Sequence, residues 1–193
     1  MKQPLNRKVK ILMLCPDCFI IDRRVIQEAA SLTRAGYDVV LLCGFDCPED
    51  ADYSLDGIEI HRYRYNYVDK ILLNAFPTFG IFAHIKRRII NIYRYFYSKF
   101  AVLSSFDRFV LDKASQFRAD IVHVHDLPFL KHAAILSGKW NVPLVYDAHE
   151  IFYANDAFTD SQKARFIKEE RAYIGSVNIF MTVNEAIADY FNE

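Results

Sequence analysis

The sequence predicts an α/β protein with a Rossmann-like, doubly wound and mostly parallel sheet of about six strands. Two observations lead to this class. Short apolar runs alternate with segments of helical period, and the joins between them are short and carry Asp, Asn, Gly or Pro. Strands connected through helices pair in parallel with right-handed crossovers. The sequence contains no repeat or flexible linker, so we expect a single domain over 1–193.

The elements follow from these patterns in chain order. The expected strands are 9–15, 38–43, 57–63, 121–125, 143–147 and 177–183. The expected helices are 23–35, one from Asp126 to Gly138, 161–174, and one that begins after Asn184. Asp22 can cap the first helix and Gly36 can end it. We expect a polar loop over Phe45–Asp56 and, because strand 57–63 is mixed in character, a place for it at an edge of the sheet.

One segment departs from the alternation. Ile71–Phe106 contains no acidic residue, and residues 82–100 combine an apolar stripe at helical spacing with a basic face. This pattern favours a helix packed on the sheet, and it also fits a helix that lies on an anionic membrane surface.

The charge balance limits the kind of partner. Lys+Arg and Asp+Glu each number 24, which argues against a nucleic-acid-binding protein. The apolar run near the N-terminus is too short for a signal-peptide core or a membrane span. We therefore expect a cytoplasmic protein, with peripheral attachment to the inner face of the membrane through 82–100 as an alternative.

The four cysteines form two close pairs, Cys15 with Cys18 and Cys43 with Cys47. Both pairs follow neighbouring strands, so a zinc site of four thiolates or a redox pair is compatible with the spacing. Buried reduced thiols are the simpler interpretation, and we expect no bound metal.

Polar residues gather where two expected strands end. One strand finishes in His123-Val124-His125-Asp126 and the next in Asp147-Ala148-His149-Glu150. Each residue alone has a structural explanation: Asp126 can cap a helix, and His123 can be a core histidine. Open parallel sheets bind ligands at the carboxyl ends of their strands, so we expect these side chains to face one crevice.

Several pieces of the sequence carry a family resemblance. They are the segment from Asp22 to Val39, the strand ends 120–126 and 143–150, and Phe180–Asn184. The chain resembles the N-terminal, acceptor-side domain of a GT-B glycosyltransferase, in the retaining group of family 4. The resemblance leaves 45–117 unmatched, and the loop 16–21 lacks the glycine-rich turn of many relatives.

The resemblance implies a division of roles. His149 would be the catalytic residue and lie against the donor sugar. Residues near the acceptor or a phosphate would be Asp22, Arg23, Arg24, His125, Asp126, Asp147 and Glu150. The donor would be a nucleotide-sugar, bound by a C-terminal domain that is absent from this chain, and the acceptor a glycan or a lipid-linked sugar. Such enzymes usually need no metal and no cofactor.

Three alternatives remain open at the level of sequence. One is half of a nucleotide-sugar epimerase of the same architecture. Another is a metal-dependent hydrolase with His123, His125, Asp126 and His149 as ligands, although H-x-H within a strand needs further ligands from elsewhere. The last is a non-catalytic binding module.

Overall fold

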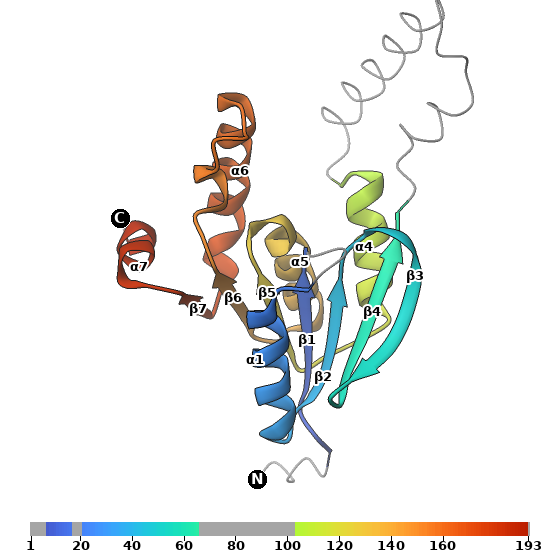
Figure 1. The fold of residues 1–193 in the computed structure, drawn as a ribbon. Coiled ribbons are helices and arrows are strands. Elements are labelled where there is room, and N and C mark those ends of the chain that lie inside the picture. The colour runs from blue at the N-terminus through green and yellow to red at the C-terminus, as the bar shows by residue number, and fades with distance from the viewer. Residues whose placement is uncertain (1–6, 17–20, 66–102, 193) are drawn as a thin grey trace, which may run out of the picture.

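The computed structural model describes residues 7–16, 21–65 and 103–192, which form a sheet flanked by helices (Figure 1). The strands are β1 (Lys10–Cys15), β2 (Asp38–Cys43), β3 (Asp46–Leu55), β4 (Ile58–Arg64), β5 (Ile121–His125), β6 (Leu144–Ala148) and β7 (Ile179–Thr182). The helices are α1 (Arg23–Arg34), α4 (Ser105–Ser115), α5 (Leu130–Trp140), α6 (Asp160–Tyr173) and α7 (Glu185–Asn192). Short 3-10 turns occupy Leu127–Phe129, Phe152–Ala154 and Ile174–Ser176.

The sheet confirms the predicted fold class. In the described part of the chain it has seven strands in the order β3-β4-β2-β1-β5-β6-β7. Every pairing from β4 to β7 is parallel, and β3 pairs with β4 in the antiparallel direction. The order of strands reverses between β1 and β5, which is the topological switch point where open α/β sheets bind their ligands.

The prediction of a loop over Phe45–Asp56 is wrong, because Asp46–Leu55 is strand β3. The turn that follows carries Asp56 and Gly57, both with positive φ (52° and 81°), as in a two-residue hairpin turn. Since β3 takes the outer position, β4 is not the edge strand that its mixed sequence suggested. An edge strand can be polar because one side of it faces water, so hydrophobic alternation does not reveal it.

The two faces of the sheet carry separate cores. On one face Val25 and Ala29 of α1 pack against alternate residues of β1 and β2, including Met13 and Leu41. The other face is covered by α4 and α5, whose Val110 and Leu130 belong to the larger cluster. In the parallel pairing of β1 with β5, Met13 lies beside His123. His123 therefore faces α1, and so does His125 two residues later.

The connection after β5 differs from the sequence prediction. Asp126 makes no side-chain cap bond to the following turn, and its φ is 58°. Gly138 lies inside α5, and the helix ends instead at Trp140. Its cap residue is Asn141, which is in the left-handed conformation with φ 55°. Asn is one of the few residues that adopt this conformation readily.

Helix α4 was not expected from the sequence. It begins with a capping box in which Ser104 accepts from the backbone of Asp107, and Asp107 in turn accepts from the backbone of Ser104. The expected amphipathic segment 82–100 lies outside the described residues.

Candidate functional site

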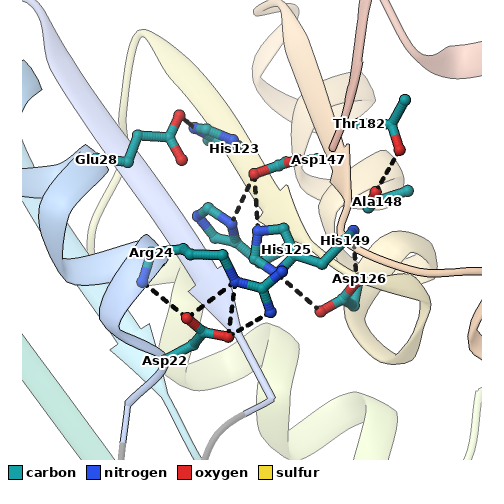
Figure 2. Close-up of polar contacts among 10 residues, drawn as sticks. All are labelled: Asp22, Arg24, Glu28, His123, His125, Asp126, Asp147, Ala148, His149 and Thr182. Atoms are coloured by element: carbon teal, nitrogen blue, oxygen red, sulfur yellow. Dashed lines mark hydrogen bonds and ion pairs between the residues drawn. The ribbon is translucent and has the colours of Figure 1, made fainter. Parts of the chain in front are cut away.

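The start of α1 supplies the first part of the candidate site. Asp22 caps the helix as predicted, accepting a hydrogen bond from the Arg24 backbone N–H at 2.7 Å. The same carboxylate accepts from the Arg24 guanidinium, at 2.6 Å from Nη2. This contact lowers the pKa of Asp22 to about 2. Arg24 is thereby held over the carboxyl ends of β5 and β6 (Figure 2).

The ends of β5 and β6 lie side by side, as predicted. His125 pairs with Asp147 in the parallel register. The backbone N–H of Asp126 then donates to the carbonyl of Asp147 at 2.9 Å. The Asp126 carboxylate accepts from the backbone N–H of His149 at 2.9 Å. These bonds hold Asp126 at φ 58° and ψ 164°, a conformation that non-glycine residues rarely adopt and that recurs at functional sites.

His149 lies between two carboxylates. Its Nε2 donates to Asp147 Oδ2 at 2.9 Å, and its Nδ1 lies 3.3 Å from Asp126 Oδ2. The contacts with Asp126 and then Asp147 outweigh burial and raise the pKa of His149 to about 10. The imidazole is therefore a cation at neutral pH. Its side chain is only 5% exposed, so the charge is held almost entirely by protein groups.

The histidines form a row on the α1 face of the sheet. The ring centroids of His123 and His125 are 4.5 Å apart, and those of His125 and His149 are 5.4 Å apart. Burial lowers the pKa of His123 to about 3, so this imidazole is neutral. Burial alone would raise the pKa of Asp147, but the neighbouring His125 and His149 outweigh it and the pKa is lowered.

The structure brings together most of the predicted site residues. The cluster at this edge contains Asp22, Arg24, His125, Asp126, Asp147 and His149 (Figure 2). Arg23 and Glu150 are exposed, and no contact joins them to the cluster in the described part of the chain.

Sequence reasoning missed Glu28 as a member of the site. Its Oε1 lies 3.7 Å from His123 Nδ1, and burial raises its pKa. The signal was available: Glu28 lies three residues after Val25 and next to Ala29, the two buried residues of α1. An acid at that helical position faces the sheet rather than water.

The ligand set considered for a hydrolase is divided in the structure. His149 and Asp126 contact each other, whereas His123 and His125 lie beside Glu28 and Asp147. Three of the cysteines, Cys15, Cys43 and Cys47, are buried in the core. Cys18 lies outside the described residues, so the four-thiolate site stays untested.

The sequence of residues 21–193 matches the family described as Glycosyltransferase Family 4. The chain belongs to Glycosyltransferase Family 4. The match confirms the resemblance found in the sequence and includes all the residues of the cluster. It begins just before the cap of α1 and, unlike the sequence resemblance, runs through residues 45–117. No match was found among curated proteins.

Solved structures give a distant likeness to this family 4 chain. One from E. coli, described as trehalose-6-phosphate bound with UDP-2-fluoro glucose, has 11% identity and a TM-score of 0.47, with 89% of this chain and 39% of that chain covered. An apo structure of OtsA has 11% identity and a TM-score of 0.46, with 90% of this chain and 40% of that chain covered. Sucrose-phosphate synthase from Thermosynechococcus elongatus has 12% identity and a TM-score of 0.45, with 92% of this chain and 47% of that chain covered. The chain thus spans less than half the length of these proteins.

None of the described helices is long and apolar enough to cross a membrane.

Proposed function

We propose that this chain is the acceptor-binding half of a retaining glycosyltransferase, which moves a sugar from a nucleotide-sugar to a glycan or a lipid-linked acceptor. The observation that carries the proposal is the polar cluster at the topological switch point, within a chain of Glycosyltransferase Family 4. The donor would bind to a second domain that faces this edge of the sheet.

The charges of the cluster suit an acceptor that carries phosphate or hydroxyl groups. Arg24 and the N-terminal turn of α1 supply positive charge and N–H donors. The carboxylate of Asp126 is a hydrogen-bond acceptor suited to sugar hydroxyls. Asp22 keeps the guanidinium of Arg24 in place through contacts from both Nε and Nη2.

His149 is the proposed catalytic residue. As a buried cation it would stabilise negative charge that develops on the leaving diphosphate. Its Nδ1 contact with Asp126, at 3.3 Å, is the longer of its two ring contacts. We propose that this contact opens when the donor binds, so that Nδ1 donates to the donor while Nε2 stays on Asp147. The leaving phosphate would accept the proton of the acceptor hydroxyl.

The test uses a protein in which this chain is joined to its donor-binding domain. Replacement Arg24→Ala should raise the KM for the acceptor about tenfold, as expected for losing a charged hydrogen bond of about 1.5 kcal/mol, and leave the KM for the donor unchanged. Arg34→Ala is the matched control, because Arg34 is an exposed arginine at the other end of α1. Retained configuration at the anomeric carbon is checked by NMR of the product.

Two results would reject the proposal. One is the absence of nucleotide-sugar consumption with every donor and acceptor tried. The other is an Arg24→Ala enzyme whose acceptor KM equals that of Arg34→Ala.

A further inference from the structure

Four potential metal ligands meet beneath α1, next to the contacts of His149. They are Glu28 from α1, His123 and His125 from β5, and Asp147 from β6 (Figure 2). Each of these residues offers one nitrogen or carboxylate oxygen, and these atoms all lie within 4.8 Å of one another. Strand register explains the meeting, because His123 and His125 are two residues apart on one face and Asp147 pairs with His125.

The two imidazoles of β5 are poorly satisfied by the described part of the chain. His123 Nε2 and both ring nitrogens of His125 are buried and have no hydrogen-bond partner there. The side chains are 4% and 0% exposed, so water does not reach them from the surface. Buried polar atoms in proteins are nearly always satisfied, and exceptions call for a missing ligand or water. Glu28 Oε1 lies 3.7 Å from His123 Nδ1, and Asp147 Oδ2 lies 3.5 Å from His125 Nδ1. Both distances are too long for a good hydrogen bond.

We propose that Glu28, His123, His125 and Asp147 bind one divalent transition-metal ion, with Zn²⁺ as the best fit. Two imidazoles with two carboxylates form a ligand set that suits zinc and its neighbours, whereas Ca²⁺ and Mg²⁺ prefer oxygen ligands throughout. The two carboxylates balance the charge of the ion. Side-chain rotation must bring the donors together, since ligands of tetrahedral zinc at ~2.0–2.1 Å lie about 3.3 Å apart.

The site has the features of a structural metal centre. Four protein ligands fill a tetrahedral shell and leave no position for a substrate or a reactive water. His149 supports it from outside, because its Nε2 holds Asp147 Oδ2 at 2.9 Å. The ion would cross-link α1 to β5 and β6 and so fix Arg24 relative to His149. The proposal departs from the expectation of no metal, which considered strand residues and cysteines and did not place a helix residue beside them.

The experiment is a Zn²⁺ titration of the untagged chain after treatment with a chelator, followed by calorimetry and thermal unfolding. We expect one ion per chain and a raised Tm. Loss of an outer-shell partner typically weakens metal binding by about 10–100-fold, so loss of a ligand in Glu28→Gln or His123→Asn should weaken it by at least ~100-fold. The control is His61→Asn, since both nitrogens of His61 already lie 2.7 Å from carboxylates of Asp52 and Glu59.

A second measurement decides the question if the variants do not fold. Co²⁺ added to the unchanged chain should give the visible bands of a tetrahedral site without thiolate-to-metal charge transfer, because no cysteine is a ligand. The proposal is overturned if no stoichiometric binding occurs, or if thiolate bands appear. It is also overturned if Glu28→Gln and His123→Asn bind like the unchanged chain, or if His61→Asn abolishes binding.

Discussion

His149 combines burial with a positive charge, and this combination makes it the residue with the clearest functional signature. A buried charge is costly unless it is paired, and here Asp126 and Asp147 pair it from two sides. An arrangement that serves packing alone would be satisfied by a neutral side chain of similar size. The pairing instead keeps a cation at the edge of the sheet where, in our proposal, a diphosphate leaves.

Replacement His149→Ala in the joined enzyme should lower turnover by about 10²–10³-fold while the protein stays folded, because one stabilising contact to the transition state is lost. Turnover and Tm are measured together. His123→Ala is the comparison: His123 lies deeper in β5, so its loss should mainly lower stability. A sharp fall in Tm for His149→Ala, with normal turnover of the remaining folded enzyme, would show that His149 is structural.

Asp126 offers a prediction that depends on backbone conformation. At φ 58° and ψ 164° a residue with a Cβ is strained by about 1–3 kcal/mol, whereas glycine is not. Asp126→Ala and Asp126→Gly both lose the carboxylate, but only the alanine variant keeps the strain. We expect Asp126→Gly to be more stable than Asp126→Ala by about 1 kcal/mol or more in urea unfolding. Equal midpoints would show that the strand end relaxes to another conformation.

At the scale of elements, Asp107 links two helices on the face of the sheet opposite α1. It caps α4 with Ser104, and it accepts hydrogen bonds from Lys131 at 2.7 Å and His132 at 3.0 Å, both on α5. Burial opposes ionisation, but these partners prevail and lower the pKa of Asp107. The carboxylate therefore stabilises the folded protein in its ionised form.

The pKa of Asp107 is lower in the folded than in the unfolded chain, so its contribution is complete above the unfolded value of ~3.9 and is lost as the pH falls through the folded value. Asp107→Asn should lower the free energy of unfolding at pH 7 by about 1.5–3 kcal/mol, the usual value of hydrogen bonds to a charged group. The difference between wild type and variant should shrink below pH 4. Urea unfolding at pH 7 and at a pH below 4 measures this difference in the free energy of unfolding. A difference that stays constant would contradict the stabilising role of the ionised Asp107 carboxylate.

Sequence patterns predicted the buried elements well because burial on both faces requires continuous apolar runs. β1 and β2 contain such runs, and β5 and β6 begin with apolar residues before His or Asp appears. The order of these strands alone predicts that Asp126 and Asp147 lie at one edge of the sheet. The sequence analysis did not predict β3, because this strand is polar, although the Asp56-Gly57 turn was a signal for a hairpin. The place of Glu28 in the site was not predicted, because the packing of a helix on a sheet depends on tertiary structure that periodicity alone does not determine.

At the scale of the whole molecule, the candidate site lies at an edge of the sheet rather than inside the domain. Arg24 is exposed there, whereas His149 and Asp147 are covered by neighbouring side chains. A nucleotide-sugar needs a pocket that encloses most of its surface. In our proposal the second domain supplies that pocket, and this half supplies the acceptor and the charge of His149.

We therefore predict that chain 1–193 alone does not turn over any nucleotide-sugar. The same chain joined to its donor-binding domain should release nucleoside diphosphate in a coupled assay. The two halves mixed as separate proteins should be slower than the joined protein at equal concentration, because joining converts their meeting into an intramolecular step with an effective concentration near the millimolar range. Turnover by 1–193 alone at the rate of the joined protein would show that the donor site lies within this chain, and would overturn the division of roles between the two halves.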